Sequence, residues 1–591
     1  MTVTDAIRKL RNTDTIIIIG FTLLSLLLLF NHEPWRDEAQ AWLLARDSAS
    51  IGALLSQMGY EGAPALWHLI LCLPAQLGLP YRTMFIIHFL IILTAVTTFM
   101  RHAPFSRTQK ILFVFGYYAL YEYNTIARNY AVSVMLLFFI AAMYKNRFKR
   151  PVVYALLIFL LSNSNVHNLA ISMTLAGMYL IELAFNKTSS LNKKHILSVC
   201  IIAAGFFAAI HQISPPKDLA PSFARWYFDL DRSQYTYIIT TAINNAFSVK
   251  FLYEAARYGM VFFFGDNFFV KYLFFTFPLA TLLSCLIIFA TVGCLIKKTQ
   301  PLLIFLVSTI SLIVIFCFKS AGDARHHGFI FIIFIFCLWI SNTYRERPGH
   351  TFQKLVAKSF KKPLWPWGGS AYQAGALPQG ETGQASDVTG GLLSHLFTPR
   401  NCRYLITIIF SFSTMKSCPA FYNELKYDFS AGKRMAKFLT GEKLVNSKTF
   451  IASYLSSAAL SVVPFLPKPY SQLYFIEHER YRSFMVWDKD WFLASYSLPD
   501  GCHDAKSLKS IYDRLSPYTL PVGEITKRID LATAGKGYET ILLILNRKPE
   551  EPGDFLKEYH LIAQFADAIV KDESLYLYQK NDAAELWKSG F

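Results

Sequence analysis

Apolar runs long enough to cross a bilayer recur along this chain, separated by short charged breaks, and they constrain its fold more than any other feature. A helix needs about 20 apolar residues to span the hydrocarbon core. Hydrophobic residues make up 53% of the 591-residue chain and charged residues only 17%, which is membrane composition. We therefore predict a polytopic α-helical membrane protein with about 11–13 transmembrane helices. The clearest runs are residues 14–30, 83–100, 110–123, 131–144, 151–162, 169–185, 196–212, 272–296, 300–318, 328–342 and 403–416.

The first of these runs is interpreted as a retained span. Arg8, Lys9 and Arg11 precede it as they would a signal peptide, but no small-residue cleavage site follows. A shorter apolar stretch, 64–77, is bracketed by prolines, and its length alone leaves open whether it crosses the membrane or lies along its surface.

Loop charges predict the orientation, because cytoplasmic loops are enriched in Lys and Arg. Alternate loops carry the basic residues Arg101, Arg107, Lys110, Lys145, Arg147, Lys149, Arg150, Lys187, Lys193, Lys194, Lys297 and Lys298. The loops between them, 31–60, 121–129 and 163–168, are neutral or carry acidic residues. We expect a multi-pass protein of the bacterial inner membrane with its N-terminus in the cytoplasm.

Two longer loops interrupt this pattern. Residues 213–271 are aromatic-rich and are expected to form an outward lid or interfacial segment, whereas 343–402, rich in Gly and Pro, is expected to be a flexible cytoplasmic loop. The basic residues behind the net charge of +18 lie mainly in short loops and not along one soluble face. We therefore expect membrane lipids as partners and no nucleic acid.

Residues 417–591 have soluble composition and follow the membrane domain, 1–416. Strand-like runs at 449–454, 472–476, 540–545 and 574–578, with a helical stretch near 433–439, predict a periplasmic α/β domain. Cys418 and Cys502 would then lie in an oxidising compartment, where they either pair or remain two separate thiols.

The most informative segment lies in the first outer loop, 31–82. Asp37 and Glu38 stand between Trp35 and Trp42, just beyond the first span. Two acidic residues at a helix start can simply favour the helix dipole. They can also act chemically, one carboxylate deprotonating an acceptor hydroxyl while its neighbour orients the acceptor or a cation. The chain has no Walker loop, dinucleotide fingerprint or Cys-x-x-Cys pair, so ATP-driven transport and cytosolic nucleotide chemistry have no motif.

This Asp-Glu pair, followed by Glu61-Gly62-Ala63-Pro64-Ala65-Leu66-Trp67-His68, resembles the GT-C superfamily of membrane glycosyltransferases. The resemblance is to its protein mannosyltransferase, aminoarabinose transferase and Rhizobium lipopolysaccharide glycosyltransferase members, the glycosyltransferase family 39 type. It covers the first six or seven spans and implies a polyprenyl-phosphate sugar donor. Relatives often have His-Pro-Pro where this chain has Gly62-Ala63-Pro64, so the use of a divalent metal is left open.

The resemblance also implies roles for single residues. Asp37 would be the general base, Glu38 its acceptor-side partner and Arg128 the donor-phosphate ligand, although Arg128 could instead reach lipid headgroups. Arg325 and His326, at the start of the tenth run, are expected to contact the donor phosphate. Further residues that could line the same cavity are Glu61, His68, Tyr130, His167 and Asp323.

Two classes of function compete most closely, and a non-enzymatic assembly scaffold, which would tolerate Asp37→Asn, is a third. The favoured one is an inverting glycosyltransferase that moves a sugar from a polyprenyl-phosphate donor to a lipid, glycan or protein acceptor on the periplasmic side. The alternative is a transporter or flippase of lipid-linked saccharides, which also needs many spans. Transporters commonly show related halves, and the Asp-Glu segment has no second copy.

Overall fold

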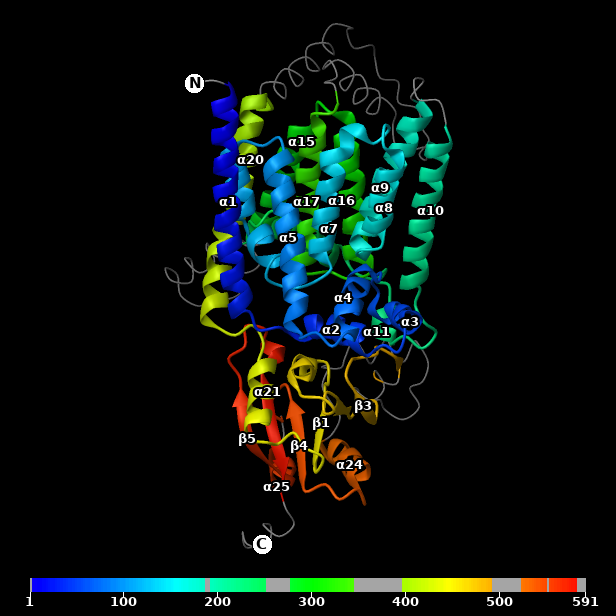
Figure 1. Ribbon diagram of the computed structural model, residues 1–591, viewed down its shortest axis with the longest axis vertical. Coiled ribbons are helices and arrows are strands. Elements are labelled where there is room, and N and C mark those ends of the chain that lie inside the picture. The colour runs from blue at the N-terminus through cyan, green and yellow to red at the C-terminus, as the bar shows by residue number, and fades with distance from the viewer. Residues whose placement is uncertain are drawn as a thin grey trace, which may run out of the picture.

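The long apolar runs form one helical bundle, and a smaller domain with a sheet lies against one end of it (Figure 1). The computed structural model describes residues 3–185, 192–250, 277–344, 396–489, 491, 522–549 and 552–581. The N-terminus lies at the far end of the bundle from the C-terminal domain (Figure 1). Residues 251–276 and 345–395 lie outside the described residues, so most of the predicted flexible loop, 343–402, is not tested.

The membrane character predicted from the sequence is confirmed. Seven helices of the described chain are long and apolar enough to cross a bilayer. They are α1 (Val3–Asn31, apolar from Thr13), α5 (Arg82–His102), α9 (Val166–Phe185), α10 (Lys193–Ile213), α15 (Phe277–Leu295), α16 (Thr299–Phe318) and α17 (Ala324–Ser341). The bundle also contains α6 (Arg107–Val114), α7 (Tyr130–Met143), α8 (Pro151–Ser162), α12 (Arg232–Ala246) and α20 (Pro399–Lys426).

Two predicted spans are helical but short. At 1.5 Å per residue, the 14 residues of α7 and the 12 of α8 rise only about 21 and 18 Å. α8 ends in a buried polar turn, where the Asn163 side chain donates to the backbone oxygens of Phe159 and Gly205 at 2.9 and 3.0 Å. Such an end is tolerated at membrane depth because protein, and not lipid, satisfies its polar groups.

The expected span at 110–123 is wrong as a single helix. α6 ends at Val114, and a π-helix, Tyr117–Glu122, follows after Gly116. A Cβ atom at Gly116 would lie 2.8 Å from the Ser413 hydroxyl of α20. That hydroxyl accepts a hydrogen bond from the Tyr117 backbone N–H at 3.0 Å, so α20 holds the break in place.

The interpretation of 213–271 as an outer loop is wrong in its middle part. α12 lies within that range and packs into the bundle: Asn244 donates to the Ala280 carbonyl of α15 at 3.0 Å, and Asn245 lies 3.2 Å from His327 of α17. Buried amides lowered the hydropathy of this helix, which is why a search for apolar runs passed over it.

Three short helices, α2 (Arg36–Asp47), α3 (Ile51–Glu61) and α4 (Leu66–Gln76), lie at the end of the bundle that meets the soluble domain (Figure 1). The apolar stretch whose path was left open forms α4, which at 11 residues rises about 16 Å and cannot cross a bilayer. Its start is fixed to the ends of α8 and α10, because Leu66 N donates to the Asn163 carbonyl and Ala65 N to the Gln212 side chain.

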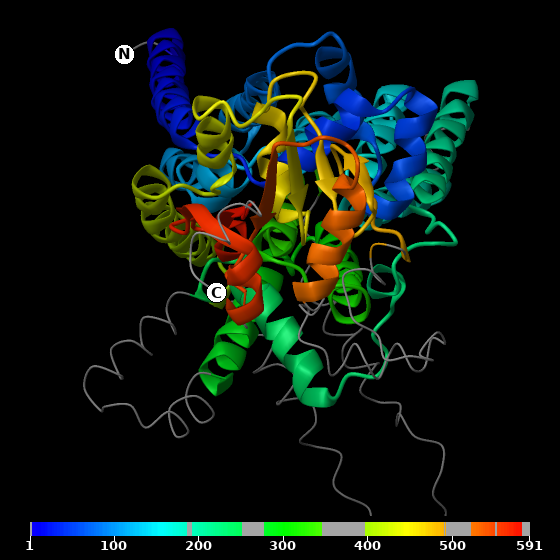
Figure 2. The same cartoon turned by 90° about the horizontal axis from the view of Figure 1, so that it is seen from below.

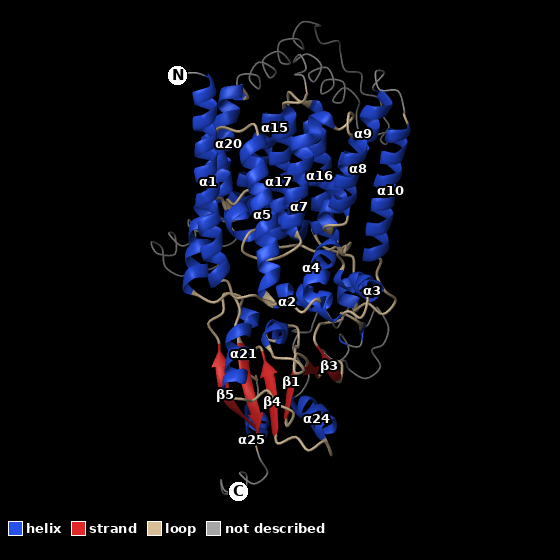
Figure 3. Ribbon diagram, viewed as in Figure 1, coloured by secondary structure: helices blue, strands red, loops and turns tan. Residues whose placement is uncertain are grey.

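The described strands all lie in the C-terminal domain (Figure 3), which confirms its predicted α/β character. The sheet order is β3-β2-β1-β4-β6-β5, with β1 parallel to β2 and β4 and the other pairs antiparallel. The strands are β1 (Thr449–Ser453), β2 (Leu473–Phe475), β3 (Arg480–Arg482), β4 (Thr540–Leu545), β5 (Tyr559–Phe565) and β6 (Leu575–Lys580). The sequence did not predict β3 or β5, and the predicted helix near 433–439 is α21 (Gly432–Gly441).

Helices cover both faces of this sheet. α24 (Val522–Thr533) and α25 (Pro552–Glu558) pack on one face, and α21 packs on the other. Ala39 and Leu43 of α2 belong to the same apolar cluster as α21, whereas Ala41, Trp42 and Ala45 belong to the core of the bundle. Seen from below, the domain lies over the bundle with α2 to α4 beside it (Figure 2). One short helix is thus part of both cores.

Candidate active site

The chain turns sharply after α1 and starts α2 at Arg36, where two acidic residues occupy the first turn. Carboxylates are favoured there by the helix dipole. The Glu38 side chain accepts a hydrogen bond from the Trp35 backbone N–H at 3.1 Å and so closes the start of the helix. Successive helical residues point about 100° apart, and Asp37 therefore faces a different neighbourhood from Glu38.

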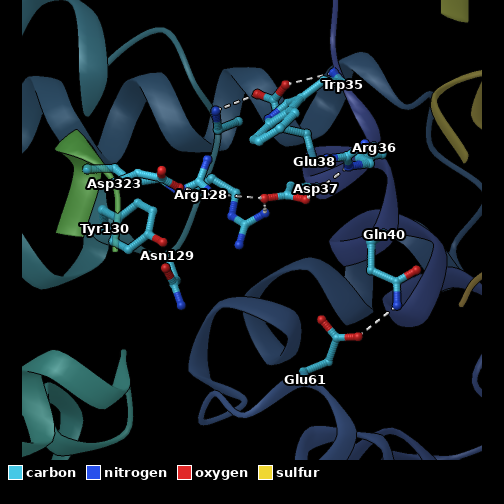
Figure 4. Close-up of polar contacts among 12 residues, drawn as sticks. Trp35, Arg36, Asp37, Glu38, Gln40, Glu61, Arg128, Asn129, Tyr130 and Asp323 are labelled. Carbon is cyan, nitrogen blue, oxygen red and sulfur yellow. Dashed lines mark hydrogen bonds and ion pairs between the residues drawn. The ribbon is translucent and has the colours of Figure 1, made fainter. Parts of the chain in front are cut away.

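Asp37 faces two arginines that come from distant parts of the chain. Its Oδ2 lies 2.7 Å from Nη1 of Arg128 and 3.5 Å from Nη2 of Arg325. Arg128 lies just before α7 and Arg325 in the first turn of α17. Figure 4 shows the Arg128 guanidinium directed at the Asp37 carboxylate. Three of the four side chains predicted as base and phosphate ligands thus meet at one place.

The charge of Asp37 is stabilised there. Burial raises the pKa of this carboxyl, but the positive charges of Arg128, Arg325 and Arg36 outweigh burial and lower it below its usual value of 3.8. The side chain nevertheless remains 27% exposed. A carboxylate that is ionised at neutral pH and open to small molecules can accept a proton, and its two arginines can bind an anion beside it.

Arg325 is held from three sides. Its Nη2 lies 3.1 Å from the carboxylate of Asp323, and its guanidinium stands 5.1 Å from the centre of the Trp35 ring. Asp323 precedes α17 and is 67% exposed, so it forms the open rim of the group. Tyr123 donates its hydroxyl to the Arg325 carbonyl at 2.8 Å, which fixes the helix end itself.

Glu38 is fully buried. Beside the Trp35 N–H, its oxygens contact Nε2 of His32 at 3.0 Å and the backbone N–H of Ala127 at 2.5 Å. The expected role as an acceptor-side partner does not fit this environment, because both oxygens are engaged within the protein and none faces the space beside Asp37. Helical periodicity places the two side chains on different faces but does not tell which face the protein buries.

His326 and Tyr130 are hydrogen-bonded to each other beside the two arginines. Nδ1 of His326 accepts from the Asp323 backbone N–H at 2.9 Å, and Nε2 lies 2.8 Å from the Tyr130 hydroxyl. His167 stacks on His326 with ring centres 4.9 Å apart and is itself bonded to Asn165. With both ring nitrogens occupied, His326 is not placed to contact a phosphate as the sequence predicted, and it fixes Tyr130 instead.

The remaining predicted cavity residues are Glu61, the last residue of α3, and His68 of α4. Glu61 accepts a hydrogen bond from Gln40 at 2.7 Å (Figure 4). Burial raises the pKa of Glu61 and the charge of Asp37 adds to the rise, whereas the Gln40 hydrogen bond and the charge of Arg128 lower it by less. Burial and the charge of Arg128 lower the pKa of His68 to about 4, which keeps that imidazole neutral. Both residues therefore belong to the surroundings of Arg128.

The sequence did not single out the residues of the soluble domain that hold α2 in place. Arg36 pairs with Asp572 at 2.5 Å, and its backbone N–H donates to Glu573 at 2.9 Å. Gln40 bonds the backbone of Met485 through both its amide oxygen and its amide nitrogen, each at 2.9 Å. No local signal could have found these pairs, because the partners lie more than 400 positions away.

Within the part of the chain that the structure describes, no three His, Cys, Asp or Glu side chains come together as a metal site. Cys418 is exposed in α20, and Cys502 lies outside the described residues, so their pairing stays a prediction.

Comparisons with known proteins give little beyond this geometry. No protein-family model matches the sequence, and the search of curated proteins finds no match. Among solved structures, the chain is similar to ArnT from Cupriavidus metallidurans in the apo state. That alignment covers 96% of this chain and 98% of the other, at 11% identity and a TM-score of 0.44. A likeness this loose carries no function across.

Proposed function

We propose that this protein is an inverting membrane glycosyltransferase of the GT-C type, which transfers a sugar from a polyprenyl-phosphate donor to an acceptor on the outer side of the membrane. The observation that carries the proposal is the contact of Asp37 with Arg128 and Arg325 at one end of the helical bundle. A carboxylate that can accept a proton lies there beside two guanidiniums that can bind a phosphate.

The orientation rests on charge. The predicted cytoplasmic loops, for example those at Arg101 and Lys145, follow the ends of α5 and α7 that lie away from α2. By the rule that cytoplasmic loops are basic, α2 and the soluble domain face the periplasm. A lipid-linked donor suits this place, because its chain can stay among the spans while its phosphate reaches the two arginines.

In the proposed reaction the acceptor hydroxyl oxygen attacks the anomeric carbon of the donor sugar and Asp37 takes the hydroxyl proton. The bond from that carbon to the phosphate oxygen breaks, and the polyprenyl phosphate leaves with the electron pair. Arg128 and Arg325 stabilise the charge that develops on it. A bound phosphate also draws the guanidiniums away from Asp37, which raises the basicity of this carboxylate when the donor is in place.

The test is transfer from a panel of radiolabelled polyprenyl-phosphate sugars to a membrane extract by the purified protein. Asp37→Asn removes the base, and we expect at least a 100-fold loss of transfer. Asp47→Asn, at the other end of α2, is the matched control and should keep the activity. Equal activity of Asp37→Asn and wild type would overturn the role of Asp37. A folded wild type that transfers from none of the donors would favour a flippase.

A further inference from the structure

A network of buried charged side chains adjoins the candidate site through Glu38. His32, just after the first span, places its two ring nitrogens against two carboxylates, with Nε2 3.0 Å from Glu38 and Nδ1 2.7 Å from Glu424 of α20. The side chains of the imidazole and both acids are at most 1% exposed. Charged groups are rarely buried this deeply unless they are paired.

The network requires a charged imidazole. A neutral histidine would turn one nitrogen lone pair toward a carboxylate, whereas the imidazolium donates from both nitrogens. Burial lowers the pKa of His32, but Glu38 and Glu424 raise it by more, to about 10. His32 is therefore a cation at neutral pH that joins the end of α1, the start of α2 and the end of α20.

Both carboxylates extend the network to the segment that carries Arg128. Glu38 accepts from the Ala127 backbone N–H at 2.5 Å. Glu424 accepts from the Tyr121 hydroxyl at 2.8 Å. Residues 123–126 between these two attachment points form no helix or strand. Their first three backbone N–H groups bond back to the π-helix, and Glu38 holds the far end of the segment at Ala127.

We propose that His32 and Glu424 are positioning residues, which act through Glu38 and Tyr121 to hold residues 121–128 so that Arg128 stands opposite Asp37. Arg128 immediately follows the residue that Glu38 binds, and its guanidinium is 2.7 Å from Asp37. The significance of this for catalysis rests on the proposed function. The hydrogen bonds themselves can be tested without it.

Hydrogen exchange of purified protein, followed by mass spectrometry, tests the positioning directly. In His32→Gln we expect peptides that cover 123–129 to exchange about tenfold faster than in wild type, because the Ala127 N–H loses its fixed acceptor. Tyr121→Phe, which removes a single hydroxyl, should give a smaller increase in the same peptides and serves if His32→Gln does not fold.

The matched control is Glu182→Gln. Glu182 of α9 accepts from Arg147 at 2.5 Å, near the ends of α7 and α9 that lie away from the site, so its loss perturbs a largely buried ion pair elsewhere in the bundle. This variant should leave the 123–129 peptides unchanged. Equal exchange of these peptides in wild type and in both test variants would overturn the proposal, as would an equal increase in Glu182→Gln.

Once a donor is identified, the pH profile of transfer separates positioning from a general loss of stability. With Arg128 displaced, the Asp37 carboxyl should titrate about one pH unit higher in His32→Gln, so the acid limb of kcat/KM moves up by that amount. The groups that face Asp37 are Arg128, Arg325, Arg36, Glu61, Tyr130 and Glu573. If the acid limb of kcat/KM stays in place although the 123–129 peptides exchange faster, the link to Asp37 is overturned. A wild type without transfer activity would overturn only the proposed function.

Discussion

Asp37 and Glu38 are neighbours in sequence but have opposite environments. Asp37 is 27% exposed and meets two guanidiniums, whereas Glu38 is fully buried and holds backbone and imidazole donors. The same helical turn thus supplies a group that can react and a group that fixes its surroundings. The difference comes from the direction of each side chain around the helix axis.

The pKa of Asp37 gives a pH prediction. Because the arginines lower this pKa below 3.8, the ionised base is present above that value and is lost only as the pH falls through it. We expect kcat/KM, which reports the free enzyme, to stay level down to about pH 5. Replacing Arg128 by Gln should move the acid limb upward by about one unit.

An acid limb near pH 7 in the wild type would contradict this assignment and point to Glu573. Burial raises the pKa of Glu573 to about 7, with Arg36 opposing that rise. The variant Glu573→Gln separates the two cases, since it should remove a limb that belongs to Glu573 and leave one that belongs to Asp37.

At the scale of elements, close packing of α17 against the tyrosines around the π-helix fixes Arg325. Gly328 lies one turn after Arg325, and a Cβ atom there would lie 2.3 Å from Tyr118 and from the Tyr123 hydroxyl. Tyr123 is the residue that bonds the Arg325 carbonyl. The absence of a side chain at Gly328 therefore lets the two tyrosine rings pack against the helix that carries Arg325 of the candidate site.

Gly328→Ala should consequently lower the apparent melting temperature in detergent, because the rings must move; we expect a cost of about 1–3 kcal/mol. Gly177→Ala in α9 is the control, since a Cβ atom there meets nothing within 4 Å. It should be neutral or slightly stabilising, as alanine favours helix over glycine. An equal loss of stability in both variants would show that the contact with Tyr118 and Tyr123 is unimportant.

The elements differ in how far the sequence predicts them. Apolar runs predicted the long spans, and short strand-like runs predicted β1, β2, β4 and β6. The break at Gly116 and the helix α12 were missed, since one depends on Ser413 of α20 and the other on amides that are satisfied only within the bundle. At the site, the motif indicated Asp37 and Arg128, but His32 and Glu424 meet only in three dimensions.

At the scale of the whole molecule, α2 joins two domains. Its Ala39 and Leu43 lie in the core of the soluble domain, and Trp42 lies in the core of the bundle. Arg36 and Gln40 add polar contacts to Glu573 and Met485. The soluble domain therefore helps to place the candidate base, and its removal would leave one face of α2 without its apolar partners.

Leu43→Ala tests this coupling. Leu43 is fully buried, so its truncation should cost about 2–5 kcal/mol and loosen the soluble domain and α2 together. Limited proteolysis, hydrogen exchange of α2 and the apparent melting temperature measure the effect. Leu531→Ala, at a leucine of α24 that is 71% exposed, is the control and should change neither. Faster cleavage of the soluble domain with no change of exchange in α2 would argue against the coupling.

The most direct test of the central claim is the anomeric configuration of the transferred sugar, measured by NMR on product made from a defined polyprenyl-phosphate donor. One displacement with Asp37 as the base predicts inversion in the wild type and almost no product from Asp37→Asn. Retention of configuration, or inverted product formed at the wild-type rate by Asp37→Asn, would contradict the account.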